Sequence, residues 1–143
     1  MVTRLICKHT ALMLALGLLG LSGAWAETFK LRCEVDGKFP ESVPKVAPAQ
    51  VTVELQLIGR HLYFKVVGPK YYEMRVSTLE TEDFKGVNLN SDSRIGARRQ
   101  ERSTQLETEI VIERGSMELK AHHDVALSGK TQRFKYTGKC RPA

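Results

Sequence analysis

Histidine and aspartate side chains of the kind that bind metal ions are adjacent in one segment, at His122, His123 and Asp124. A zinc ion takes nitrogen, oxygen or sulfur ligands that converge on it from several directions. Because successive side chains of a strand point to opposite faces, the two histidines cannot both reach one ion unless the backbone bends. His61 lies in a separate predicted turn. We therefore interpret the segment as a solvated turn between two strands, and we expect no metal site and no cofactor.

Carboxylates form a second group that could do chemistry. Glu107, Glu109 and Glu113 share one face of a predicted strand, and Glu118 follows across a turn. General acid-base catalysis needs a carboxyl group whose pKa is shifted by a pocket, whereas this spacing is typical of the solvated face of an amphipathic sheet. The chain also has no Gly-x-Ser-x-Gly, no His-Glu-x-x-His and no phosphate-binding glycine loop. We predict that the protein is not an enzyme.

Four arginines, Arg94, Arg98, Arg99 and Arg102, lie in the polar segment 91–104, which we predict to be an exposed loop. A guanidinium group binds phosphate and carboxylate through paired hydrogen bonds, so this loop is a candidate for recognition of an anionic partner. The alternative is a flexible, solvated insertion. Nucleic acid is not an expected partner, because no aromatic residues interleave with the arginines and the formal net charge is only +6.

Hydrophobic residues recur with a period of two over most of the chain, which indicates β-strands that could position these groups. Apolar side chains occupy every second position of residues 51–57, and again of residues 62–67 after a glycine turn. Turn signals recur about every eight to twelve residues, as in antiparallel sandwiches and barrels. Residues 38–50 contain three prolines and are predicted to be an irregular connection. We predict one all-β domain over residues 27–143, an antiparallel sandwich or small barrel of about seven to nine strands.

Two cysteines, Cys33 and Cys140, lie near opposite ends of the predicted domain, and each has the parity of the core-facing residues in its strand. An even number of cysteines in an exported chain indicates a disulfide, the alternative being two buried free thiols. A disulfide between these residues would make the first and last strands neighbours in the sheet.

The outward positions of these two terminal strands are mainly basic. They are Lys30 and Arg32 on the first strand and Arg133, Lys135 and Lys139 on the last, with Glu34 as the only acidic residue in the predicted patch. Like charges on neighbouring strands destabilise a sheet, so an anionic partner is a natural reason for this pattern. The alternative is that the two strands are edge strands, which carry Lys and Arg to prevent aggregation.

Residues 1–26 have the pattern of a secretory signal peptide. Arg4 and Lys8 precede an apolar stretch, and an Ala-Trp-Ala cleavage signal ends at Ala26. We predict cleavage between Ala26 and Glu27 and a periplasmic or secreted protein. The apolar stretch is shorter than the roughly 20 residues of a transmembrane helix, so no transmembrane segment is expected. Loss of Arg4 and Lys8 lowers the formal net charge from +6 to +4.

Several short motifs resemble those of small, uncharacterised exported proteins of proteobacteria. They are Cys33 soon after the leader, the strand that begins at Val51, Ile-Val-Ile-Glu-Arg-Gly at residues 110–115 and Tyr-Thr-Gly-Lys-Cys at residues 136–140. Proteins of this kind often carry an Ile-Asp-Arg-x-Thr-Gly hairpin and end in Gly-x-Cys. The resemblance implies an all-β fold and a periplasmic location, and it implies no particular activity.

The chain is also similar to secreted lysozyme inhibitors of the small-barrel kind, which have a cysteine in the first strand, a cysteine in the last and a polar loop between them. Residues 93–98, Ser-Arg-Ile-Gly-Ala-Arg, resemble their Ser-Gly-containing loop, although the aromatic residue that should follow is missing. We expect an exported, non-enzymatic binding or accessory protein that recognises an anionic protein, lipid or envelope component. The alternative is an inhibitor that inserts residues 94–102 into the acidic cleft of another enzyme.

Overall fold

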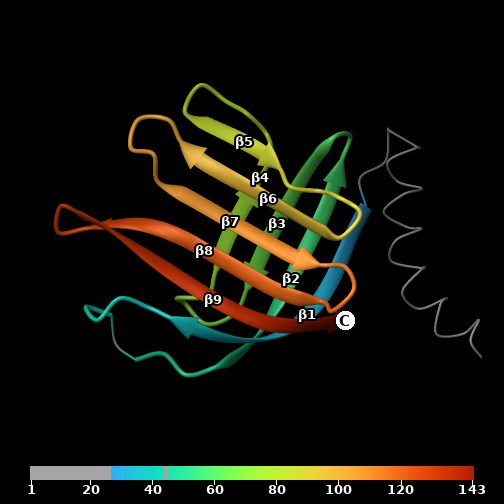
Figure 1. Cartoon of the computed structure of the whole chain (residues 1–143), viewed down its shortest axis with the longest axis horizontal. Helices are drawn as coiled ribbons and strands as arrows, with labels where there is room; N and C mark the ends of the chain where they lie inside the picture. The colour runs from blue at the N-terminus through green and yellow to red at the C-terminus, as the bar shows by residue number, and fades with distance from the viewer. Residues whose placement is uncertain (1–26, 44) are drawn as a thin grey trace, which may run out of the picture.

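The computed structural model describes residues 27–43 and 45–143, and the predicted leader lies outside this part of the chain. The described residues form nine strands, and none of them belongs to a helix that could cross a membrane (Figure 1). The strands are β1 (Glu27–Lys38), β2 (Ala49–Ile58), β3 (His61–Val67), β4 (Met74–Ser77), β5 (Phe84–Asn88), β6 (Arg94–Glu101), β7 (Glu107–Glu113), β8 (Glu118–Leu127) and β9 (Lys130–Pro142).

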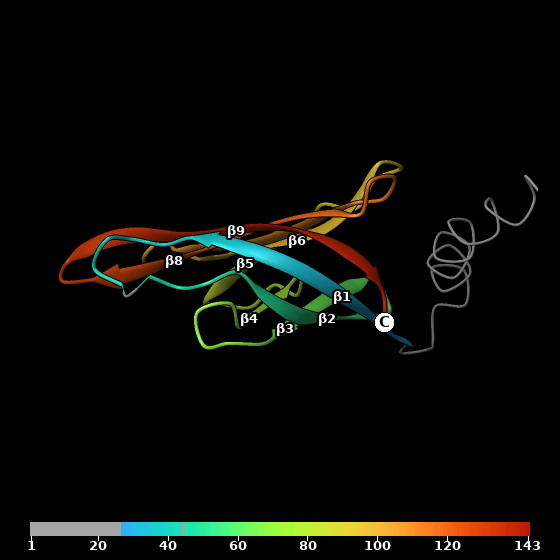
Figure 2. The same cartoon turned by 90° about the horizontal axis from the view of Figure 1, so that it is seen from below.

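One antiparallel sheet contains all nine strands, in the order β4-β3-β2-β1-β9-β8-β7-β6-β5. The sheet coils into a nearly closed barrel, so that β2, β3 and β4 lie under β6, β8 and β9 (Figure 2). The predicted all-β antiparallel architecture is therefore confirmed. The edges are β4 and β5, whereas β1 and β9 lie in the middle of the strand order.

A disulfide joins Cys33 and Cys140, which are directly opposite each other in the register of β1 and β9. Both residues are buried, because they lie on the inward parity of their strands together with Leu31, Val35 and Tyr136. The predicted disulfide and the predicted pairing of the terminal strands are confirmed.

Tyr136 connects β9 with the opposite wall of the barrel. Its hydroxyl donates a hydrogen bond to the backbone carbonyl of Tyr72 at 3.0 Å and lies 2.7 Å from the sulfur of Met74. The two tyrosine rings meet edge to face with centroids 5.4 Å apart. Burial raises the pKa of Tyr136 well above its ordinary value, so the hydroxyl remains a neutral donor.

The barrel seam, where β5 passes the end of β4, depends on Gly86. Thr78 continues the pairing of β4, since its backbone N–H donates to the Leu62 carbonyl at 3.0 Å and its hydroxyl accepts from the Leu62 N–H at 2.9 Å. A Cβ atom on Gly86 would lie only 2.2 Å from the Thr78 carbonyl oxygen. Glycine therefore permits the two edges to approach without a side chain between them.

The prediction that residues 91–104 form an exposed loop is wrong. Residues 94–101 of this segment form β6, which pairs with β5 on one side and β7 on the other. Ile95 and Ala97 are buried opposite Ile112 and Ile110 of β7, and this contact supplies the apolar face of the strand. The arginines hid the pattern because they occupy three of the other six positions in β6.

Candidate functional site

The outer surface of β1 and β9 carries the predicted basic residues and also Lys38 and Arg141, which the predicted patch does not include. The prediction that Lys38 belongs to the irregular connection is wrong, because it is the last residue of β1. Cross-strand pairing places Arg32 opposite Arg141 and Lys38 opposite Lys135, and all four side chains are exposed. Like charges directly opposite each other on one face of a sheet repel. The register therefore opposes two like-charge pairs on this face, with Glu34 and Asp36 beside them on β1.

Three other basic residues of the predicted patch have acidic neighbours from the adjoining strands. Lys30 lies 3.9 Å from Glu54 of β2, and the Nε of Arg133 donates to Asp124 of β8 at 2.8 Å. In the third case the pairing register places Lys139 between Glu34 of β1 and Glu118 of β8. The prediction that only Glu34 relieves the patch is wrong, because β2 and β8 bring further carboxylates to it.

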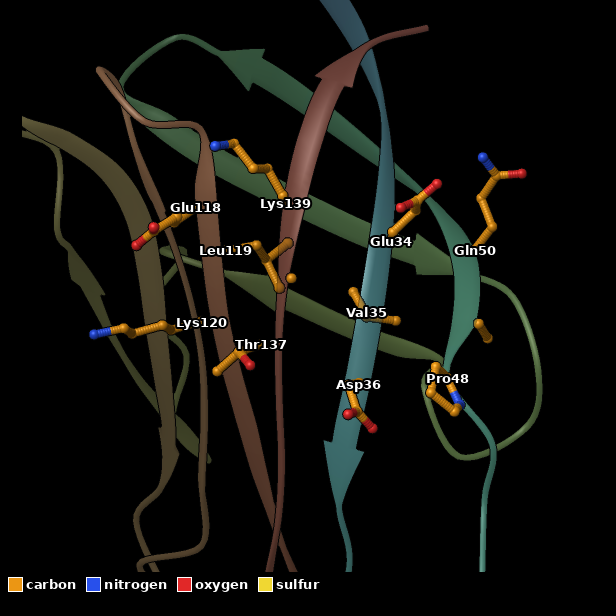
Figure 3. A pocket seen from close by; sticks show the side chains of 12 residues that line it. Glu34, Val35, Asp36, Pro48, Gln50, Glu118, Leu119, Lys120, Thr137 and Lys139 are labelled. Carbon is orange, nitrogen blue, oxygen red and sulfur yellow. The ribbon is translucent and has the colours of Figure 1, made fainter.

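A shallow groove lies between the two like-charge pairs (Figure 3). Gly138 lines the groove, and a Cβ atom there would lie 2.2 Å from the Glu34 carbonyl oxygen, so glycine allows the strands to come close. The groove spans four strands and is lined by charges of both signs. The charged residues that line it are Glu34, Asp36, Glu118, Lys120 and Lys139.

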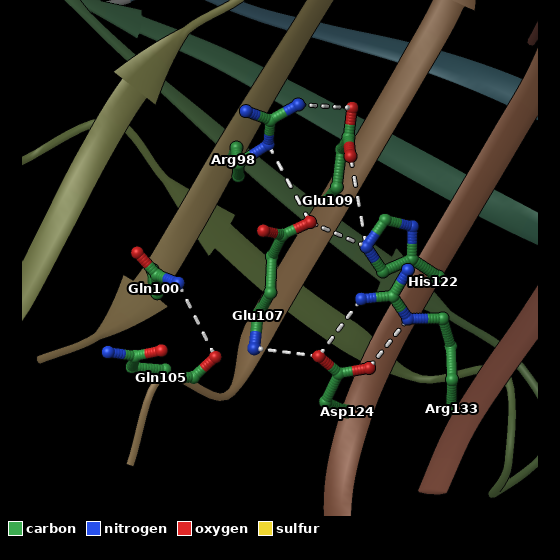
Figure 4. Close-up of polar contacts among 8 residues, drawn as sticks. All are labelled: Arg98, Gln100, Gln105, Glu107, Glu109, His122, Asp124 and Arg133. Carbon is green, nitrogen blue, oxygen red and sulfur yellow. Dashed lines mark hydrogen bonds and ion pairs between the residues drawn. The ribbon is translucent and has the colours of Figure 1, made fainter. Parts of the chain in front are cut away.

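Arg98 takes part in a polar network on the outer face of β6, β7 and β8 (Figure 4). Its Nη2 lies 3.5 Å from Glu109 and its Nε lies 3.7 Å from Glu107. The Nε2 of His122 lies 2.9 Å from the same Glu107 oxygen and 3.7 Å from Glu109. The network therefore groups two carboxylates with one guanidinium and one imidazole.

Asp124 connects this network to β9. Burial by itself would raise the pKa of Asp124, but hydrogen bonds from the Arg133 side chain and from the Glu107 N–H outweigh burial and lower it. Asp124 therefore accepts both bonds as a carboxylate. The interpretation of residues 122–124 as a turn is wrong, because all three lie in β8.

Sequence reasoning missed the grouping of Glu107, Glu109 and His122, whose ligand atoms all lie within 4.8 Å of one another. A cation could occupy this position, and in the structure the Arg98 guanidinium supplies positive charge there. The group could have been predicted from the hairpin that joins β7 and β8 at Arg114. Its pairing register places Glu109 directly opposite His122.

The other arginines of the predicted loop lie apart from Arg98. The Arg99 guanidinium carbon lies 3.6 Å from the centroid of the Phe84 ring, a cation–π contact. Arg102 donates from Nε to the Thr81 carbonyl at 3.3 Å. Arg94 is exposed at the opposite end of β6. The structure thus gives each of the four arginines different surroundings.

Comparison with models of protein families, with curated proteins and with solved structures finds no match to this chain. The resemblances drawn from short motifs therefore remain predictions.

His123 points to the opposite face of β8 from His122, and its ring stacks on Phe134 with centroids 5.0 Å apart. Burial lowers the pKa of His123, the Asp124 charge partly offsets this, and His122 adds to the lowering. Around the ring, the titratable or charged groups are His122 and Asp124 on β8 and Lys70 and Tyr71, which line the same hollow.

We expect acid to destabilise the protein through His123. The unfolded chain binds a proton near the ordinary pKa of 6.5, whereas the folded chain resists it, so the free energy of unfolding should fall as the pH drops through about 6.5. Urea unfolding of wild type and His123→Phe at pH 7.5 and 5.5 measures the effect, and the variant should show the smaller loss. His61→Phe, at an exposed histidine, is the control. Identical pH dependence in wild type and His123→Phe would contradict the prediction.

Proposed function

We propose that the protein is an exported, non-enzymatic binding protein that recognises an anionic partner on the outer face of β1 and β9. Arg32 with Arg141 and Lys38 with Lys135 form its main contacts. Lys30, Arg133 and Lys139 lie on the same face, each beside an acidic residue of a neighbouring strand. Residues 27–143 carry a formal net charge of +4, because Arg4 and Lys8 are removed with the leader. Attraction of this kind raises the rate of encounter with an anion and weakens as salt rises.

The observation that carries the proposal is the direct opposition of like charges in the two central strands of the sheet. Protection of sheet edges explains exposed Lys and Arg on edge strands. Lys38 and Arg141 lie beyond the pairing of β1 with β2 and of β9 with β8, but Arg32 and Lys135 have a partner strand on both sides, opposite Thr52 and His122. Edge protection therefore does not account for Arg32 and Lys135, which are exposed and directly opposite Arg141 and Lys38, and binding of an anion gives a reason for keeping them.

The alternative, an inhibitor that inserts residues 94–102 into another enzyme, has less support. An inserted segment must project from the scaffold, whereas β6 is held between β5 and β7. Arg98 and Arg102 already contact groups of this chain. The outer face of β1 and β9 is therefore the better candidate.

Binding of the double variant Arg32→Glu/Lys38→Glu tests the proposal. The probes are phosphatidylglycerol vesicles, lipopolysaccharide and polyglutamate, which represent a lipid, an envelope component and an anionic polypeptide. A basic residue near an anionic membrane contributes about 1 kcal/mol, and a loss of about 1.4 kcal/mol is tenfold in affinity. We expect the variant to bind at least one probe about tenfold or more weakly than wild type, and wild-type binding to that probe to weaken as salt rises.

Arg60→Glu/Lys85→Glu is the matched control, since it makes the same change in net charge at two exposed residues away from β1 and β9. This control should bind nearly as wild type does. Equal loss in both double variants would show that only net charge matters. That outcome, or wild-type binding by Arg32→Glu/Lys38→Glu to every probe, would overturn the proposal.

A further inference from the structure

The β8–β9 hairpin extends beyond the other strands (Figure 1). A half-open hollow of about 470 Å³ is lined by residues of this hairpin and by residues 42, 43, 70 and 71. The segment that follows β1 runs along this hairpin in both views (Figures 1 and 2). Ser42 of this segment donates a hydrogen bond to Gln132 at 3.0 Å. The size is in the range of small-molecule sites, about 300 to 1,000 Å³. The hollow is on the inward face of β8 and β9, opposite the face that carries Arg133 and Lys135.

Aromatic rings form one side of the hollow and its surroundings. The Phe134 ring lies nearly parallel to the Tyr71 ring, with centroids 6.3 Å apart. It also stacks on the His123 ring, with centroids 5.0 Å apart. Phe39 supports this group from behind, with its centroid 5.5 Å from that of Phe134. Val125 and Leu127 of β8 extend the apolar lining toward the hairpin turn. Flat and apolar walls of this kind bind apolar or aromatic groups.

The lining of the hollow carries little charge, and its charged group is a cation. Lys70 is the one Lys, Arg, Asp or Glu among the described residues that line it, and its Nζ lies 5.8 Å from the centroid of the Tyr71 ring. The Nδ1 of His123 is buried and has no hydrogen-bond partner among the described residues. Because burial lowers the pKa of His123, the ring is neutral at pH 7. The lining is therefore apolar along its wall and positive only at Lys70.

We propose that this hollow binds a small amphipathic anion, with its apolar body against Phe134 and Tyr71 and its anionic head beside Lys70. The body can be an alkyl chain or an aromatic ring, since both suit the same wall. The site is independent of the anionic partner of the outer face, because the two surfaces lie on opposite sides of β9 and use different residues.

Calorimetric titration with dodecanoate and with 2-naphthoate tests the proposal and distinguishes an alkyl from an aromatic body. Dodecyltrimethylammonium, with the same chain and a cationic head, is the matched ligand, and all three are kept below the concentration at which micelles form. We expect at least one carboxylate to bind with a Kd below about 1 mM. The ammonium compound should bind at least about threefold more weakly than dodecanoate if dodecanoate is the ligand. Absence of binding by both carboxylates at this concentration would overturn the proposal.

Three variants locate the site. Val125→Glu places a carboxylate in the apolar wall and should weaken binding of the carboxylate about tenfold or more, whereas Val67→Glu, the same change at an exposed valine of β3, should not. Lys70→Gln, at an exposed residue, should weaken binding about three- to tenfold and keeps the test valid if Val125→Glu does not fold. Unchanged binding in Lys70→Gln, or in a folded Val125→Glu, would overturn the proposal.

The variant Arg32→Glu/Lys38→Glu separates this site from the outer face. It should bind the carboxylate as wild type does, whatever its effect on vesicles, lipopolysaccharide or polyglutamate. Loss of carboxylate binding in this variant would assign the ligand to the outer face and overturn the hollow as its site. Carboxylate binding that survives while every polyanion probe fails would overturn the proposed function alone.

Discussion

Replacement of both Cys33 and Cys140 by alanine should lower the free energy of unfolding by about 4 to 5 kcal/mol. The disulfide joins residues that are 107 positions apart, so it removes a large part of the conformational freedom of the unfolded chain. It also joins β1 covalently to β9, and these strands are neighbours in the middle of the strand order. Urea unfolding followed by circular dichroism measures the change, and the melting temperature should fall by roughly 10 to 20 °C.

Wild type treated with a reductant under denaturing conditions and then refolded is the control, since it keeps both cysteines. Its stability should approach that of the double alanine variant. Denatured, unreduced wild type should show no reactive thiol from Cys33 or Cys140. A loss below about 1 kcal/mol in the double variant would contradict the structural role of this disulfide.

Replacement of Tyr136 by alanine should cost about 3 to 5 kcal/mol, the range for loss of a large aromatic side chain from a core. The ring is almost fully buried, and it fills the space between β9 and the turn that carries Tyr72. Its hydroxyl also satisfies the Tyr72 carbonyl. The variant should therefore leave both a cavity and an unpaired carbonyl in the core.

Tyr136→Phe separates these two effects, because it keeps the ring and removes only the hydroxyl. We expect it to cost about 1 to 2 kcal/mol, the effect of leaving a buried carbonyl without its donor. Chemical denaturation of both variants gives the two values. Equal losses in Tyr136→Phe and Tyr136→Ala would show that packing of the ring contributes little, contrary to this account.

Much of the fold could be predicted from the sequence because its signals are local. Alternation over residues 51–57 predicts a strand with one buried face, and β2 has that pattern. The parity of Cys33 and Cys140 within their own strands predicted that both face the core, and one disulfide then places β1 beside β9. These inferences need no knowledge of the other strands.

The surroundings of the outward charges could not be predicted in the same way, since they depend on the order of all the strands. Glu54 approaches Lys30 only because β2 lies beside β1, and Glu118 flanks Lys139 only because β8 lies beside β9. β6 was missed for a different reason. Its apolar face consists of Ile95 and Ala97, too short a pattern to recognise among the three arginines of the strand.

The most direct test of the central claim measures the stability and the binding of one variant, Arg32→Glu/Lys38→Glu, in parallel. Each glutamate would face a basic residue across the register, Arg141 or Lys135, so repulsion becomes attraction. The account predicts a free energy of unfolding that is unchanged or higher by up to about 1 kcal/mol, with binding to an anionic probe at least about tenfold weaker. A variant that binds every probe as tightly as wild type, or that loses binding because it is less stable, would contradict the claim that these charges are kept for a partner.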